Sequence, residues 1–319
     1  MEGSHFAVSN PGAQGPRLQR ARTRRSTGEQ IIKGLLALAA LLSVLTTTGI
    51  VVTLIKETIT FFGDVPIGDF LFKTDWAPLA GGEQQAFGVV PLIWSTLYLT
   101  AVGLVVAIPA GLGVGIYLAE YASPRVRKIL KPVVELLAGI PTIVFGYFAL
   151  TFFTPNVIQD WIGIGVDVFN GLSAGIILGI LVLPTIASVS EDAMSAVPQS
   201  LREGAFGLGA AKWQVVLRVV FPAALSGIVA ALVLGASRAI GETVVILVAA
   251  GNNPNLTFDL TVAHQNMAAF IANTARADVS AGSIAYETIF AVGTTLFVMT
   301  LVLNLIAIRF VRKYRQVYE

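Results

Sequence analysis

The sequence predicts an all-α polytopic membrane protein with six transmembrane helices. Apolar residues make up 55% of the 319-residue chain and charged residues only 13%, about half the charged share of soluble domains. Mean hydropathy is +0.76. Six apolar runs approach the roughly 20 residues that a helix needs to cross a bilayer. These runs are 34–55, 92–117, 133–153, 172–190, 225–249 and 285–308. A water-soluble globular fold is therefore excluded.

The chain begins with a basic segment that lacks apolar periodicity. Residues 1–30 are rich in Gly, Pro, Ser and Arg, a composition that indicates a disordered tail. The apolar run that follows is too long for the hydrophobic part of a signal peptide, and no small-residue cleavage site comes after it. We therefore expect residues 31–87 to hold a retained first transmembrane helix and an outer loop. Residues 88–312 would form a five-helix transmembrane domain.

The basic residues gather on alternate loops. Seventeen of the 21 Lys and Arg residues lie in four places: the N-terminal tail, the loop after the second run, the segment 191–222 and the C-terminal end. The other loops hold three. The positive-inside rule places the basic side in the cytoplasm. Both termini, including residues 313–319, and the segment 191–222 are thus predicted to be cytoplasmic.

Several kinds of chemistry are absent from the sequence. There is no cysteine, which excludes thiol catalysis, disulfides and Cys-type metal sites. The two histidines, His5 and His264, are far apart in polar stretches, and we expect each to be a solvated surface residue. No phosphate-binding loop of the G-x-x-x-x-G-K-[ST] type occurs. We expect no metal, no cofactor, no nucleic-acid partner and no ATPase activity of the chain's own, so the protein is not predicted to be an enzyme.

The fifth apolar run contains two charged residues, Arg238 and Glu242, near its middle. Each costs about 2.5–3.5 kcal/mol to insert at that depth. Four residues apart on one helix, they share a face and can pair with each other or with a neighbouring helix. One interpretation is a guanidinium in a water-filled path that binds a tetrahedral oxyanion. The other is a structural clamp between helices that never meets substrate.

Residues 200–222 form a polar, amphipathic segment between two long apolar runs. Ser200 and Glu203 have the spacing of a capping box, which predicts that a helix starts there. Gly207 and Gly209 would break the chain, and a second short helix would carry Trp213, Val216 and Val220 along one face. Pro222 suits the first turn of the next helix.

This segment resembles the EAA loop of type I ABC-transporter permeases. The resemblance rests on Glu203-Gly204-Ala205, on Gly209 and on Val219-x-Phe221-Pro222. It departs from the usual pattern, which has Ala at Gly204 and Ile and Leu at Val219 and Phe221. The resemblance implies a coupling helix that docks in a cleft of an ATP-hydrolysing subunit, with Glu203, Gly204, Ala205, Gly209 and Pro222 as coupling residues. The alternative is an ordinary interfacial connector in which Glu203 only caps its helix.

The charged stretch carries a second resemblance. Ser237, Arg238, Glu242 and Thr243 lie in a heptapeptide similar to the R-A-x-G-E signature of oxyanion importers, and Thr243 fits phosphate permeases better than sulfate or molybdate permeases. Other stretches also resemble PstC-type permeases of phosphate-specific ABC importers. These are Gly139–Gly146, Leu183–Thr185, Gly88–Pro91 with Leu118–Tyr121, and Ala281–Phe290 with Val317–Glu319.

This resemblance implies a phosphate importer that works by alternating access in a bacterial cytoplasmic membrane. Ser237, Arg238, Glu242 and Thr243 would line the substrate pathway. The implied partners are a homologous PstA-like permease, a dimeric PstB-like ATP-binding subunit, a PstS-like phosphate-binding protein outside the membrane, and the lipid bilayer.

Three other functions are compatible with the residues. One is a sulfate or molybdate permease of the same class. Another is an autonomous secondary transporter or channel, although six spans without an apparent inverted repeat are few for such carriers. A non-transporting scaffold would leave the insertion cost of Arg238 and Glu242 without a compensating role.

Overall fold

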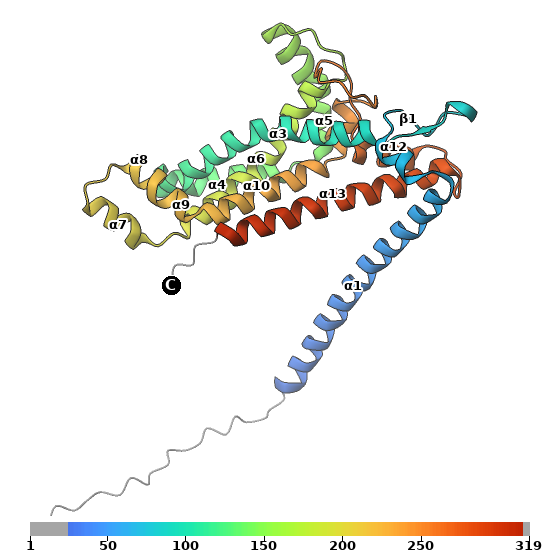
Figure 1. Ribbon diagram of the computed structural model, residues 1–319. Coiled ribbons are helices and arrows are strands. Elements are labelled where there is room, and N and C mark those ends of the chain that lie inside the picture. The colour runs from blue at the N-terminus through green and yellow to red at the C-terminus, as the bar shows by residue number, and fades with distance from the viewer. Residues whose placement is uncertain (1–24, 315–319) are drawn as a thin grey trace, which may run out of the picture. The chain divides into compact units, whose positions relative to one another are not determined.

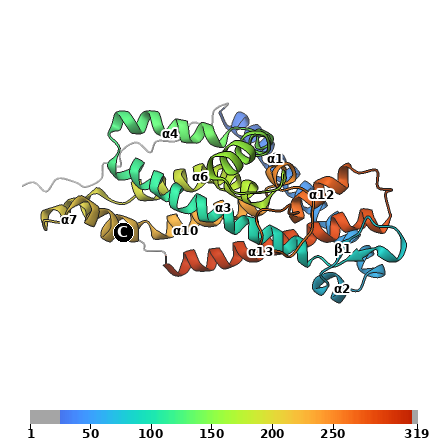
Figure 2. The ribbon, with the colours of Figure 1, turned by 90° about the horizontal axis from the view of Figure 1, so that it is seen from above.

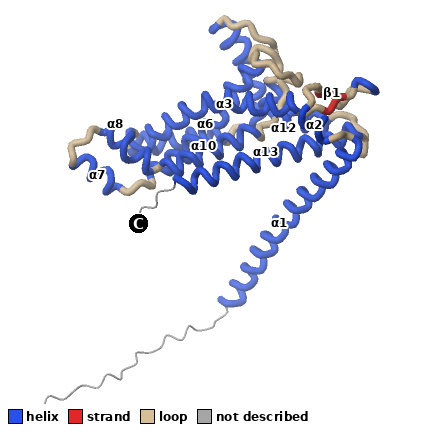
Figure 3. Tube along the Cα trace, viewed as in Figure 1, coloured by secondary structure: helices blue, strands red, loops and turns tan. Residues whose placement is uncertain are grey.

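The computed structural model describes residues 25–314, and these are largely helical (Figures 1 and 3). The predicted all-α class is confirmed. Most of the predicted tail 1–30 and of the C-terminal end 313–319 lies outside the described residues. Residues 25–30 are helical, because the first helix begins at Arg25.

The helices are α1 (Arg25–Asp64), α2 (Ile67–Phe72), α3 (Val90–Ile116), α4 (Pro124–Ala138), α5 (Thr142–Phe148), α6 (Gly171–Ser195), α7 (Gln199–Gly207), α8 (Lys212–Val215), α9 (Phe221–Ala223), α10 (Leu225–Ile240), α11 (Val244–Ala249), α12 (Met267–Arg276) and α13 (Ile284–Tyr314). The 3-10 turn η1 (Gly82–Gln84) and the π-helices η2 (Tyr117–Tyr121), η3 (Ala149–Ile162) and η4 (Val216–Val220) connect some of them. The strands β1 (Trp76–Ala77) and β2 (Ala86–Phe87) pair in antiparallel fashion.

The chain divides into two compact units, residues 1–53 and 54–319. In the first unit, the described residues form one continuous helix whose large apolar side chains are exposed, as a helix facing lipid requires. The second unit contains the remaining helices and both strands.

Among residues 25–314, five helical segments are long and apolar enough to cross a membrane. They are Gly28–Asp64, Val90–Tyr121, Thr142–Ile162, Gly171–Ser195 and Ile284–Arg309. A sixth arises if Lys212–Ala223 and Leu225–Ile240, which meet at a bend of 72°, are counted as one broken span. All six predicted runs thus contain helix, but two of them are interrupted.

The predicted run 133–153 is not one helix. The amphipathic helix α4 ends at Ala138, and α5 begins at Thr142 with Pro141 as its N-cap. Proline has no N–H and disfavours helical backbone at the residue before it. The third membrane-crossing segment therefore starts at Thr142 and continues through the π-helix η3 to Ile162. The predicted start of this span at residue 133 was therefore too early by about two and a half helical turns.

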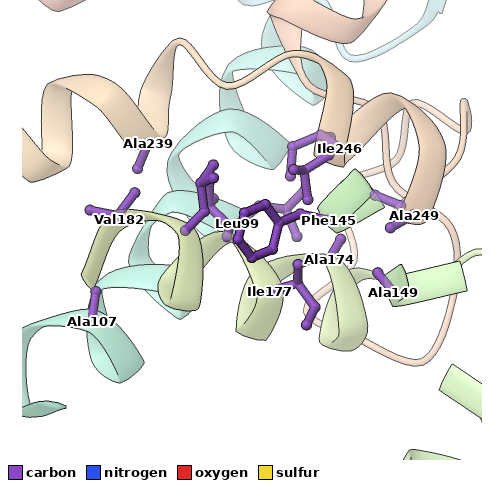
Figure 4. Packing of buried hydrophobic residues seen from close by; sticks show 14 of the residues in the cluster. Leu99, Ala107, Phe145, Ala149, Ala174, Ile177, Val182, Ala239, Ile246 and Ala249 are labelled. Carbon is purple, nitrogen blue, oxygen red and sulfur yellow. The ribbon is translucent and has the colours of Figure 1, made fainter. Parts of the chain in front are cut away.

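Four helices of the second unit lie lengthwise beside one another. The helix α3 packs along α6, and α10 packs on one side against α6 and on the other against α13 (Figures 1 and 2). Helices α7 and α8 lie at the same end of this bundle as the end of α13, while α12 and β1 lie at the opposite end. The core between α3, α5, α6, α10 and α11 is apolar, and Leu99, Phe145, Ile177 and Ile246 meet there (Figure 4).

Glycines let α3 and α6 approach to backbone contact. A Cβ added at Gly179 would lie 2.6 Å from the Gly103 carbonyl oxygen and 2.8 Å from Val106 Cβ. A Cβ at Gly175 would lie 2.5 Å from Val102 Cγ1. Small residues at such positions allow close helix packing in membranes. The contact makes α3 and α6 a closely interlocked pair.

We expect Gly179→Ala to destabilise the protein by about 1–3 kcal/mol, because the added methyl group meets backbone that cannot move aside easily. Gly113→Ala is the matched control on α3, since a Cβ there meets no heavy atom within 4 Å. The measurement is the temperature at which each variant in detergent stops eluting as a single species. Equal temperatures for the two variants would contradict the tight α3–α6 contact.

His264 is buried, so the predicted solvated surface position is wrong. Its Nε2 lies 2.9 Å from the carbonyl oxygen of Asp259, and its Nδ1 lies 3.5 Å from Ser95 Oγ on α3. The ring also fills the space next to Gly171 at the start of α6. The loop before α12 is thereby fixed to the N-terminal parts of α3 and α6. His5 lies outside the described residues.

Burial lowers the pKa of His264 below its usual 6.5, because the imidazolium is disfavoured in an apolar site. In the unfolded chain the histidine takes up a proton at higher pH than in the folded chain. Its contribution to stability is thus complete above pH 6.5 and falls as pH drops below that value. We expect the unfolding temperature of the wild type to fall more steeply between pH 7 and pH 5 than that of His264→Gln, as measured in detergent. Parallel curves would contradict this.

Candidate functional site

In the structure the helix of the fifth apolar run is interrupted two residues after Arg238. Helix α10 ends at Ile240 with Gly241 as its C-cap. Glu242 is buried, and its Oε1 accepts hydrogen bonds from the backbone N–H groups of Val244 at 3.1 Å and Val245 at 3.3 Å. Its carboxylate therefore satisfies the free N–H groups at the start of α11. The predicted continuous span 225–249 is wrong at this point.

Arg238 lies in the last turn of α10 and contacts a neighbouring helix. Its Nη1 donates to Thr185 Oγ1 on α6 at 3.1 Å. The ion pairs among the side chains that the structure describes do not include Arg238 or Glu242. The two residues do not form the intrahelical pair that their spacing allowed, because the helix does not continue to Glu242. The half-buried guanidinium keeps further donors for an anion or for water.

The other two predicted pathway residues make local contacts. Ser237 Oγ donates to Asn304 Oδ1 on α13 at 2.8 Å. Thr243 Oγ1 donates to the carbonyl oxygen of Gly241 at 3.2 Å. Ser237 thus connects α10 to α13, and Thr243 bonds within the short link between α10 and α11. Thr185 was not predicted as a site residue, although it lies in one of the stretches that carried the sequence resemblance.

The polar segment 200–222 lacks the helix cap that the sequence predicts at its start. Helix α7 begins at Gln199 after Pro198, and its N-cap has no side-chain hydrogen bond, so the predicted capping box of Ser200 and Glu203 is wrong. Gly209 has a φ of +81°, which confirms the predicted turn there. Gly207 is the last residue of α7, and Pro222 lies in the first turn of α9 as predicted.

Several residues of this segment are exposed. Glu203 and Gly204 are exposed and Ala205 is half-buried. Four large apolar side chains are also exposed there: Phe206 by 46%, Leu208 by 91%, Trp213 by 52% and Leu217 by 53%. We call these four residues, with Glu203, the docking face, after the role that the sequence resemblance implies. Exposed apolar clusters of this kind mark interaction sites.

The predicted single face of Trp213, Val216 and Val220 divides in two. Val216 and Val220 are buried, and Val220 packs in a core cluster with Met194 and Ile228. Trp213 points outward, and the Arg218 guanidinium lies 6.0 Å from its ring. The short helix therefore has an inner side that attaches it to the bundle and an outer side that is free for contact.

Two buried carboxylates tie the neighbouring helices together at this end of the bundle. Glu191 on α6 is fully buried and binds Arg127 and Lys131 of α4, with Lys131 Nζ at 2.5 Å. Lys131 also reaches Asp192 at 2.7 Å, and the hydrogen bonds to Asp192 and Glu191 raise the pKa of Lys131 above its usual value. Glu120 in η2 binds Arg202 of α7 at 2.8 Å. A cavity of about 370 Å³ lies between the two pairs.

Residues 111–316 match the family model of binding-protein-dependent transport system inner membrane components. The chain belongs to this family. The matched range contains the break after α10, both buried carboxylates and the docking face.

Two curated members of this family of transport components are similar over most of their length. The chain is 34% identical to the probable ABC transporter permease protein YqgH of Bacillus subtilis over 258 residues, which is 78% of this chain and 79% of that protein. It is 33% identical to the phosphate transport system permease protein PstC of Haemophilus influenzae over 308 residues, 90% of this chain and 94% of that protein.

The fold also has solved counterparts among transport components. A chain of a bacterial alginate ABC transporter, in complex with its alginate pentasaccharide-bound periplasmic protein, superposes with a TM-score of 0.62. The match covers 91% of this chain and 99% of that chain at 20% identity. This likeness shows a shared ABC-permease fold, in agreement with the sequence resemblance.

Proposed function

We propose that this protein is the PstC-like permease subunit of an ATP-driven importer of inorganic phosphate. The observation that carries this proposal is the 33% identity to a phosphate permease over 90% of the chain. The half-buried Arg238, which contacts Thr185 but no carboxylate among residues 25–314, supports it. A guanidinium with free donors is the side chain best suited to bind an oxyanion through several hydrogen bonds.

We further propose the assembly and its orientation. The charge distribution favours both termini and the docking face in the cytoplasm of a bacterium. The partners are a homologous PstA-like permease, a dimer of PstB-like ATP-hydrolysing subunits of which one binds the docking face, and a PstS-like phosphate-binding protein outside. In this assignment residues 31–87 precede the transmembrane domain 88–312, and the segment 191–222 is its coupling loop.

The proposed mechanism is alternating access. ATP binding closes the ATP-hydrolysing dimer and moves the docking face, and the helices open outward. Phosphate enters and is attracted by Arg238, and it leaves inward after hydrolysis. Glu242 serves this path indirectly, because its carboxylate holds the start of α11 and so keeps the helix break next to Arg238 in place. No covalent step occurs on this chain.

The test of this function is substrate competition in the reconstituted assembly. The chain is co-expressed with its partner subunits, purified in lipid vesicles with ATP inside, and supplied with radiolabelled phosphate and the binding protein outside. We expect ATP-dependent phosphate uptake that unlabelled phosphate blocks and sulfate or molybdate does not. Uptake of labelled sulfate or molybdate in place of phosphate would identify the rival oxyanion permease instead.

A further inference from the structure

Arg202 lies in the middle of α7, yet its side chain faces inward and is only 11% exposed. Its Nη2 and Nε donate to Glu120 Oε1 at 2.8 and 3.2 Å. Its Nη1 donates to the carbonyl oxygen of Val197 at 2.5 Å, and Nη2 also donates to the carbonyl oxygen of Met194 at 2.8 Å. One guanidinium thus makes four contacts inside its own chain.

These acceptors belong to elements that are far apart in the sequence. Met194 lies in the last turn of α6, where carbonyl groups have no helical partner and the helix dipole is negative. Val197 lies in the link between α6 and α7. Glu120 lies in the π-helix η2, which continues α3, and its side chain is 9% exposed. Arg202 therefore joins α7 to the ends of both α3 and α6.

Apolar contacts alone would hold α7 less specifically. Leu201 and Ala205 also pack against the core cluster beneath the segment. Apolar packing of this kind is non-directional, so it can keep α7 in place while allowing it to slide. A planar guanidinium with fixed donors allows one geometry. Arg202 therefore specifies how α7 lies against η2 and the end of α6.

We propose that Arg202 is a positioning residue that transmits displacement of the docking face to α3 and α6 together. The proposal rests on the proposed function, in which an ATP-hydrolysing subunit moves the docking face. Since α3 and α6 interlock through their glycines, the two helices move as a pair. α6 also carries Thr185, which binds Arg238. The connection therefore runs from α7 through Arg202 and α6 to the proposed anion site.

The test compares coupling with assembly in the complete complex. The variants are Arg202→Gln and Glu120→Gln, which remove one charge each with little change in volume. Arg125→Gln is the matched control, because Arg125 is an exposed cation on α4 without an ion pair among residues 25–314. We measure co-purification of the ATP-hydrolysing subunit, ATP hydrolysis, and uptake of radiolabelled phosphate in vesicles.

We expect both variants to bind the ATP-hydrolysing subunit as the wild type does, while the ATP hydrolysed per phosphate imported rises about tenfold, within the range typical of coupling between sites. For Arg202→Lys we expect a ratio of ATP to phosphate between those of the wild type and Arg202→Gln, because an ammonium keeps the charge but cannot make the forked contact. Unchanged ATP per phosphate in both charge-removal variants would overturn the proposal. Loss of subunit binding in them would also overturn it, because Arg202 would then act in docking or folding. If the wild type neither binds the subunit nor imports phosphate, the proposed function fails instead.

A distance measurement separates transmission from simple loss of stability. The chain contains no cysteine, so spin labels can be placed at Ser200→Cys on α7 and Gly113→Cys on α3, two exposed positions. In the wild-type assembly we expect the distance between the two labels to have the same narrow distribution with ATP and without it. In Arg202→Gln we expect it to broaden. A distribution that stays equally narrow in the variant would contradict the role of Arg202.

Discussion

Arg238→Gln is expected to lower phosphate uptake by the assembled importer at least about 100-fold. This corresponds to a loss of about 3 kcal/mol of charge-assisted hydrogen bonding to the anion. The amide of glutamine can still donate to Thr185, but it carries no charge and lacks the planar set of donors with which a guanidinium binds an oxyanion. Uptake is measured as initial rates of radiolabelled phosphate entry into vesicles that contain equal amounts of complex.

Two further variants make this result specific. Arg238→Lys keeps the charge without the planar geometry, so we expect an intermediate rate. Thr185→Val removes the hydrogen bond that orients the guanidinium, and we expect a loss of several-fold, as for one neutral hydrogen bond. If Arg238→Gln imports phosphate at the wild-type rate, Arg238 is a structural clamp and the pathway lies elsewhere.

Leu208→Glu is expected to abolish binding of the ATP-hydrolysing subunit, with a loss of uptake of more than about tenfold. Leu208 is the most exposed large apolar side chain of the docking face, and a carboxylate there would have to be desolvated in a docked complex. Gly209→Val should also weaken subunit binding and uptake, because valine is strained at a φ of +81° and would change the turn that follows α7. Glu203→Gln should lower coupling as well. Membrane insertion should stay normal in all three.

The measurement is co-purification of the ATP-hydrolysing subunit with equal amounts of tagged chain. Leu79→Glu is the control, because Leu79 is 51% exposed in the loop between β1 and η1, at the opposite end of the bundle. It should leave subunit binding unchanged. Normal binding and uptake in Leu208→Glu, Gly209→Val and Glu203→Gln would show that the ATP-hydrolysing subunit docks on another surface.

The membrane class and most of the spans could be predicted from the sequence, because a helix that crosses a bilayer needs a long apolar segment and hydrogen-bonded backbone groups. The break after Ile240 was not, and Pro141 indicates a kink without showing that the membrane-crossing helix starts only after it. Hydropathy averages over a window, so a short backbone interruption inside an apolar run leaves little trace. The pairing of Arg238 with Glu242 failed for the same reason, since the i,i+4 geometry holds only in a continuous helix.

The buried ion pairs could not be predicted from neighbouring residues. Glu120 and Arg202 are 82 positions apart in the sequence, and Glu191 and Arg127 are 64 apart. Only the packing of α3, α4, α6 and α7 brings them together. His264 was misplaced on the surface because its polar sequence neighbours gave no sign of the pocket beside Ser95. The turn at Gly209 and the position of Pro222 in the first turn of a helix, in contrast, followed from the residue types.

The central claim is that this polypeptide is a gate driven by ATP hydrolysis on other subunits. The most direct test reconstitutes the chain alone, the chain with its partner permease, and the complete assembly in separate vesicles, each against a phosphate gradient. We predict uphill phosphate accumulation only in the complete assembly and only with ATP. Accumulation against the gradient by the chain alone, without nucleotide, would contradict the account.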